Sequence, residues 1–120
     1  MALPAHERRR FQRIAFTAQT LLEQGTQTWP TELIDISLKG LLLKTPANFT
    51  ANSNHPFTAT VALSDELSIT LELTLSHHNE QALGFVCTHI DLDSITHLRR
   101  LLELNLGDPE LLERELSALN

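Results

Sequence analysis

The sequence of 120 residues has one cysteine, no tyrosine and only four glycines. Cys87 cannot form a disulfide within the chain, so a reducing compartment is expected. Because the glycines stand far apart, at positions 25, 40, 84 and 107, neither a phosphate-binding loop nor a GxGxxG fingerprint is present. The G-x-S-x-G and H-E-x-x-H motifs are also missing from the sequence. We therefore expect no catalytic residue, no metal site and no cofactor.

Long apolar runs are absent as well. No stretch approaches the roughly 20 apolar residues that a membrane helix needs. The first ten residues have no apolar segment behind their charges, which argues against a signal peptide. We expect a cytoplasmic monomer that does not contact a membrane.

The net charge of −6 is unevenly distributed. Residues 1–13 carry four arginines and one acid, Glu7, whereas residues 14–120 carry five basic and fourteen acidic residues. An acidic body disfavours a long polyanion, which needs many phosphate contacts. A compact arginine cluster can still hold a small anion with one or two phosphates. The alternative is a solvated terminal tail.

Residues 14–90 have the pattern of six short strands. Apolar and polar side chains alternate from Leu67 to Leu75, as expected of a strand with one buried face. The expected strands span residues 14–24, 28–36, 40–44, 57–63, 67–75 and 83–90. A hairpin turn is expected at residues 24–26 and a loop from Pro46 to Pro56. Short connections favour a meander that closes into a small barrel.

The last quarter of the chain changes to a helical period. The apolar positions of a first helix are Ile95, Leu98, Leu101, Leu102 and Leu106, with Asp93 or Ser94 as its N-cap. Gly107 is placed to end this helix, and Asp108 and Pro109 to begin a second. Leu111, Leu112, Leu116 and Leu119 give the second helix an apolar stripe. The predicted fold is mainly β: a six-stranded antiparallel barrel over residues 14–120, with helices at about residues 93–119 and a flexible basic arm at residues 1–13.

Two short motifs hold the main candidate residues. Arg9 and Arg13 form Arg-x-x-x-Arg, and Asp35, Ser37 and Gly40 form Asp-x-Ser-x-x-Gly. Alone, the second motif is explained by a turn at a strand end. Together, in this order and in a β-rich chain, the motifs resemble the signature of PilZ domains, and Leu83-Gly84-Phe85 is similar to the family's late strand. The resemblance implies a bacterial receptor that binds the second messenger cyclic di-GMP.

The residue types suit that ligand. The arginine fork matches a phosphate, and it also matches the O6/N7 edge of guanine. On a strand, Asp35 and Ser37 would project from one face, where the carboxylate can accept hydrogen bonds from guanine. Gly40 would supply either a positive φ or room for the ligand to approach the backbone. The arm is expected to be mobile when free and to become ordered on the ligand.

Three further residues extend the candidate site. Arg8 and Arg10 exceed the two-arginine motif, and the resemblance implies that such arginines can accompany two intercalated copies of the ligand. His77 falls where some family members place an aromatic side chain against guanine, although imidazole offers a smaller face. The predicted ligand-binding residues are Arg8, Arg9, Arg10, Arg13, Asp35, Ser37, Gly40 and His77.

The expected output is a changed surface that an unidentified downstream protein recognises. One alternative is a PilZ-like adaptor that binds proteins and no nucleotide. Another is a small RNA- or DNA-binding barrel that uses the basic arm. The acidic body and the scarcity of aromatic residues argue against a nucleic acid polymer as partner.

Overall fold

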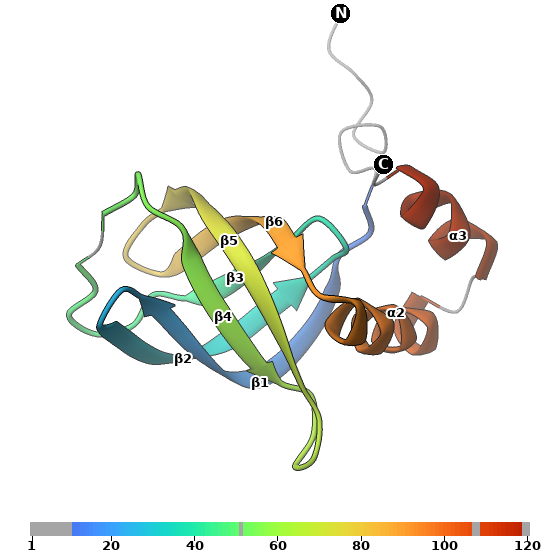
Figure 1. Cartoon of the computed structure of the whole chain (residues 1–120), viewed down its shortest axis with the longest axis horizontal. Helices are drawn as coiled ribbons and strands as arrows, with labels where there is room; N and C mark the ends of the chain where they lie inside the picture. The colour runs from blue at the N-terminus through green and yellow to red at the C-terminus, as the bar shows by residue number, and fades with distance from the viewer. Residues whose placement is uncertain (1–10, 51, 107–108, 119–120) are drawn as a thin grey trace, which may run out of the picture.

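Six antiparallel strands form a closed barrel, and two helices follow them in the described part of the chain (Figure 1). The structure is a computed structural model that describes residues 11–50, 52–106 and 109–118. The strands are β1 (Ile14–Gln24), β2 (Gln27–Ile36), β3 (Gly40–Lys44), β4 (Phe57–Ala62), β5 (Ser68–His78) and β6 (Ala82–Ile90). The helices are α2 (Leu92–Leu106) and α3 (Pro109–Ala118). The predicted fold class is confirmed.

The order of the strands around the barrel is β1-β2-β3-β6-β5-β4, and the barrel closes where β4 pairs with β1. A meander would place β4 beside β3, so that part of the prediction is wrong. β3 ends at Lys44 and β4 begins at Phe57, which leaves a long connection between them. This connection spans one end of the barrel, at the left of Figure 1. β4 can therefore return beside β1, and β6 takes the place next to β3.

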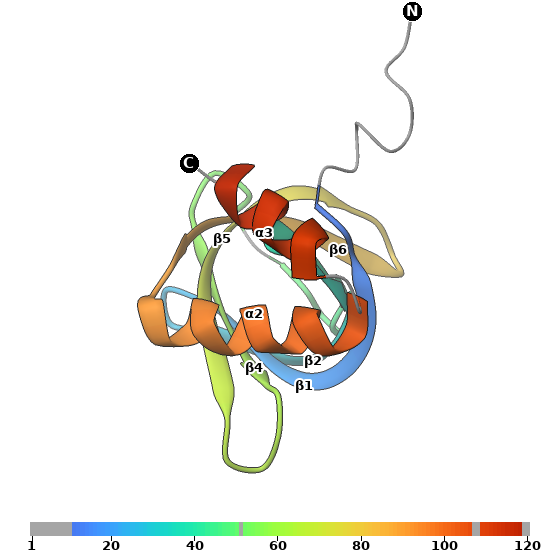
Figure 2. The same cartoon turned by 90° about the vertical axis from the view of Figure 1, so that its right-hand side faces the viewer.

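Aromatic and aliphatic side chains from all six strands fill the barrel. Phe57 and Phe85 are buried in its core and pack edge to face, with ring centroids 5.2 Å apart. Trp29 and Phe49 cover the end spanned by the long connection, with ring centroids 5.0 Å apart. The opposite end is covered by α2, which lies across it in Figure 2 and buries Leu98 and Leu102. Alternate strand residues thus make one core, as their period of two predicts.

The N-cap of α2 is Asp91, so the prediction of Asp93 or Ser94 is wrong. The Ser94 N–H donates to Asp91 Oδ1 at 2.7 Å, and the Ser94 hydroxyl donates to Asp91 Oδ2 at 3.2 Å. Ser94 is buried, and its Oγ accepts the N–H of Thr70 at 3.0 Å. α2 begins earlier than its apolar period indicates, because the chain passes directly from β6 into the helix. Ser94 then joins the helix to β5.

α3 begins at Pro109, as predicted, and the proposed cap residues Gly107 and Asp108 lie outside the described residues. Of the predicted apolar stripe, Leu116 packs against the core, and the side chains of the other three leucines are likewise not described. Arg99 of α2 forms ion pairs with Glu103 and with Glu113 of α3. Neither helix of the described residues has the length and apolar composition needed to cross a membrane.

Replacing Asp91 with alanine tests the cap. The Ser94 N–H lowers the pKa of the Asp91 carboxyl, so its stabilising effect is present above the ordinary value of 3.8 and is lost as the pH falls. Asp91→Ala should therefore lower the thermal unfolding midpoint at neutral pH, and the difference from wild type should shrink in acid. Asp93→Ala, in the same first turn, is the matched control. A larger loss for Asp93→Ala would contradict the assignment.

Candidate functional site

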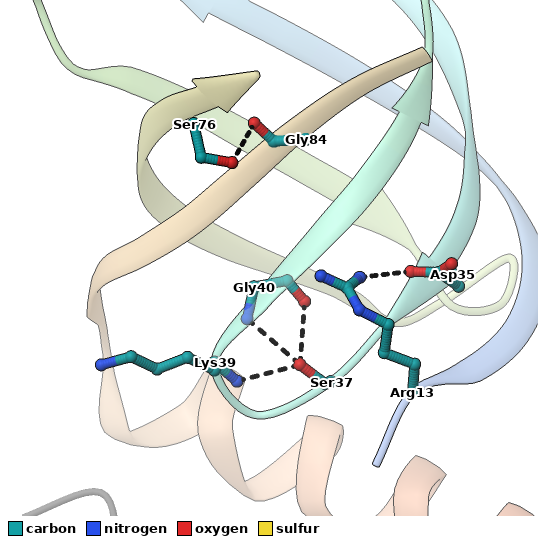
Figure 3. Close-up of polar contacts among 7 residues, drawn as sticks. All are labelled: Arg13, Asp35, Ser37, Lys39, Gly40, Ser76 and Gly84. Carbon is teal, nitrogen blue, oxygen red and sulfur yellow. Dashed lines mark hydrogen bonds and ion pairs between the residues drawn. The ribbon is translucent and has the colours of Figure 1, made fainter. Parts of the chain in front are cut away.

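The two motifs meet through an ion pair between Arg13 and Asp35 (Figure 3). Arg13 stands directly before β1, and Asp35 lies near the end of β2, which pairs with β1. Arg13 Nη1 is 2.5 Å from Asp35 Oδ1, and the side chains are 49% and 22% exposed. A pair this exposed contributes about 0–1 kcal/mol to stability. Both groups are therefore positioned on the surface while remaining easy to separate.

Ser37 is used inside the turn that follows β2. Its side chain is buried, and its Oγ accepts the N–H groups of Lys39 at 3.2 Å and Gly40 at 3.3 Å. The Ser37 hydroxyl also donates to the Gly40 carbonyl at 3.4 Å (Figure 3). The Ser37 N–H donates to the same carbonyl at 2.9 Å. Because β2 ends at Ile36, Ser37 is not on the same strand face as the partly exposed Asp35, and that premise of the prediction is wrong. The hydroxyl satisfies backbone groups of the turn.

Gly40 is required by a close approach of β6. Among the described residues, a positive φ occurs at Gly25 and Asn48 and not at Gly40. The prediction that Gly40 supplies a positive φ is therefore wrong. A Cβ atom at Gly40 would lie 2.1 Å from the carbonyl oxygen of Phe85. The space that glycine leaves open is therefore occupied by the backbone of β6. Gly40 allows β3 and β6 to pair.

Four paired residues form a row across the outer wall, which we call the Asp35–His77 row: Asp35, Leu42, Gly84 and His77. Directly paired residues of antiparallel strands share a face. The row crosses three strand spacings, about 14 Å. Between its polar ends lie Leu42, which is half-buried, and Gly84, which is buried. The row is thus a low, apolar strip with a carboxylate at one end and an imidazole at the other.

A β-bulge at each end of the row turns its polar residue outward. Leu33 pairs with Leu43 while Asp35 pairs with Leu42, so β2 has one extra residue there. In β5 the same irregularity separates Leu75 from His77. Without these bulges, Asp35 would share the inward face of Leu33, two residues earlier. The bulges therefore make both side chains available at the surface.

His77 lies against Gly84 within this row. A Cβ atom at Gly84 would be 2.6 Å from His77 Nδ1, so the imidazole occupies the space that a side chain would fill. The hydroxyl of Ser76 donates to the carbonyl of Gly84 at 2.9 Å (Figure 3). Leu42 and Gly84 were not among the predicted site residues. The sequence places both on strands, but only the strand order and register reveal that they lie between Asp35 and His77.

The predicted site residues are therefore only partly brought together. Arg8, Arg9 and Arg10 lie outside the described residues. Arg13 and Asp35 touch, whereas His77 stands at the far end of the row. In the described ranges, no three His, Cys, Asp or Glu side chains gather in a way that could hold a metal ion.

Comparisons with known proteins agree with this architecture. The family model of the PilZ domain matches residues 7–104. The fold is similar to that of the Bacillus subtilis inhibitor of motility MotI/DgrA, with a TM-score of 0.64, 15% identity and 84% of this chain covered. The match spans 56% of the length of that inhibitor. The PilZ domain of CeSA from a cellulose-synthesizing bacterium matches with a TM-score of 0.61 and 17% identity, over 80% of this chain and 96% of that domain.

Substituting Gly40 tests the close approach of β6. Gly40→Ala should destabilise the fold by about 2–3 kcal/mol, because the added methyl group meets a backbone oxygen that cannot move alone. Gly25→Ala is the matched control: its φ is +60° but nothing lies within 4 Å, so a loss of about 1 kcal/mol is expected. Urea unfolding measures both losses. Equal losses of unfolding free energy in the two variants would show that the contact with the Phe85 carbonyl is not the reason for glycine at position 40.

Proposed function

Because the chain belongs to the PilZ domain family, which binds cyclic di-GMP, we propose that it is a receptor for this dinucleotide, bound on the Asp35–His77 row. The observation that carries the proposal is the Arg13–Asp35 ion pair, which joins the two motifs at one end of the row. PilZ domains act as receptors or adaptors, and no catalytic step is assigned to this chain.

When the ligand binds, the ion pair between Arg13 and Asp35 opens, and each side chain forms hydrogen bonds to the ligand instead. In the free protein each neutralises the other at the surface. Cyclic di-GMP offers a phosphate or a guanine O6/N7 edge to the guanidinium, and guanine N–H groups to the carboxylate. The exchange costs little, because the ion pair that opens is an exposed one. Each charge-assisted hydrogen bond to the ligand contributes about 1.5–3 kcal/mol.

The middle of the row suits a flat base. Leu42 is half-buried and apolar, and beside it the His77 imidazole covers Gly84, so a guanine ring can lie against the Leu42 side chain and the imidazole. The imidazole of His77 then adds a stacking surface at the far end. Stacking of a base on an aromatic side chain contributes about 1–3 kcal/mol, and we expect the lower part of that range because imidazole is small.

The remaining arginines complete the proposal. Arg9 is assigned to a phosphate of the same ligand, and Arg8 and Arg10 to a second, intercalated copy. The segment at residues 1–13 would become ordered over the row, and a downstream protein would recognise the changed surface. We propose that the receptor works as a cytoplasmic monomer.

A PilZ adaptor that binds no nucleotide is the second candidate. It is favoured by the roles of Ser37 and Gly40, whose buried contacts maintain the turn and the β3–β6 pairing without any ligand. Those contacts do not require the exposed Arg13 and Asp35. The two candidates therefore differ in what these exposed residues do.

Calorimetric titration with cyclic di-GMP separates the candidates. We expect saturable binding by the wild type, weakened about tenfold or more by Arg13→Ala. Asp35→Ala should reduce the preference for cyclic di-GMP over cyclic di-AMP by about 1–3 kcal/mol. Arg100→Ala, an exposed arginine on α2, is the control and should bind as wild type does. Absence of binding at micromolar concentration would favour the adaptor.

Adding a methyl group at Gly84 tests whether the His77 imidazole is a stacking surface for the ligand. Gly84→Ala should displace the His77 imidazole, because the new methyl group would lie 2.6 Å from Nδ1, and should weaken cyclic di-GMP binding about tenfold. Since imidazole can rotate away, we expect a loss of unfolding free energy of only about 1 kcal/mol. Gly25→Ala, the same change in the β1–β2 turn, should leave binding unchanged. Unaltered affinity in Gly84→Ala would remove the row from the binding surface.

A further inference from the structure

Glu115 of α3 is a buried acid that the proposed site does not use. It is 2% exposed, in a helix whose neighbouring Glu113 and Arg114 are exposed. Its Oε2 accepts the backbone N–H of Gln12 at 3.1 Å. Its Oε1 is buried and has no hydrogen-bond partner among the described residues. Burying a carboxylate this incompletely satisfied is unfavourable, so the position is not explained by packing alone.

Within residues 11–50, 52–106 and 109–118, no cation forms an ion pair with this carboxyl group. The charged or titratable side chains on α2 and in the described residues before β1 are Asp93, His97, Arg99, Arg100 and Glu103 of α2 and Arg13. Arg99 is engaged by Glu103 and Glu113, and Arg13 is engaged by Asp35. Burial raises the pKa of Glu115, and the Gln12 N–H opposes this only in part. The buried position therefore favours the protonated acid.

The contact lies one residue from the proposed ligand site. Gln12 directly precedes Arg13, and α3 lies beside this entry to β1 in both Figure 1 and Figure 2. The Gln12 N–H points toward the helix at the end of the barrel, whereas the Asp35–His77 row lies on the wall. Because Gln12 adjoins Arg13, displacement of Arg13 from Asp35 toward the ligand also moves the Gln12 peptide that Glu115 holds.

We propose that Glu115 is a positioning residue that couples ligand binding to proton release: its neutral form holds Gln12 against α3, and displacement of Gln12 as Arg13 binds the ligand exposes and ionises it. This inference rests on the proposed receptor function and adds a pH dependence to it. Glu115 touches no ligand. It acts through the backbone of Gln12, and hence on the path of the chain into Arg13.

The direction of the pH effect follows from the two states of Glu115. While the contact is closed the pKa of the acid is above 4.5, and once the group is exposed to water its pKa returns toward that ordinary value. Between the two values the closed state keeps a proton that the ligand-bound state loses. Affinity should therefore increase with pH in this window, by at most about tenfold per pH unit. Below 4.5 both states are protonated, and the dependence disappears.

Calorimetry in buffers of different ionisation enthalpy counts the protons released on binding. In a series of titrations from pH 4.5 upward, the wild-type chain should release up to one proton on binding cyclic di-GMP wherever the pH lies between the ordinary pKa of Glu115 and its raised pKa in the closed contact. Glu115→Gln keeps a carbonyl acceptor for the Gln12 N–H but cannot ionise, so its release should fall to zero. Glu113→Gln, an exposed change in the same helix, should behave as wild type. Binding without proton release, or equal release by Glu115→Gln, would overturn the proposal.

A titration of the free protein followed by NMR keeps this test independent of the receptor function. The carboxyl carbon of Glu115 and the amide proton of Gln12 should shift together, with a midpoint above 4.5. A Gln12 amide that does not follow the Glu115 titration would contradict the coupling. If the two signals shift together but cyclic di-GMP does not bind, the receptor proposal fails while the contact stands.

Discussion

The pairing of β3 with β6 is the constraint on which the candidate site depends. It requires glycine at position 40, where a side chain would collide with the Phe85 carbonyl. Once formed, it sets Leu42 beside Gly84 and so joins β2 and β5 through two intervening strands. The bulges in β2 and β5 then turn Asp35 and His77 toward solvent. The row, with a carboxylate at one end and an imidazole at the other, is thus a consequence of the β3–β6 pairing and of the two bulges.

The second motif divides its work between fold and surface. Ser37 and Gly40 are buried and satisfy the turn and the strand pairing, whereas Asp35 remains accessible beside Arg13. The motif therefore contributes separately to the stability of the fold and to the free energy of ligand binding. The buried contacts stabilise the barrel, and the exposed ion pair contributes little to stability and can be exchanged for a ligand at small cost. Because the hydrogen bonds of this turn are formed without ligand, ligand binding does not incur the entropy cost of ordering the turn.

Local patterns predicted the elements well and their arrangement less well. Local sequence patterns located all six strands, most clearly at residues 67–75, where alternating apolar residues reflect the period of two of a half-buried strand. The strand order was wrong because periodicity carries no information on which strands become neighbours. The bulges beside Asp35 and His77 were equally hidden, since one extra residue changes the facing without changing composition. Asp91 was missed because α2 begins earlier than its apolar period indicates, and Glu115 was missed because its role depends on a tertiary contact with Gln12.

Mapping the bound ligand by NMR tests the central claim most directly. Cyclic di-GMP added to labelled protein should shift the backbone amides of Asp35, Leu42, Gly84 and His77, which span the outer wall from β2 to β5. The amides of β4 and of the part of β1 that pairs with it should stay unchanged, because they form the opposite side of the barrel order. Saturable shifts confined to β4 and β1, or no shifts at all, would contradict the account.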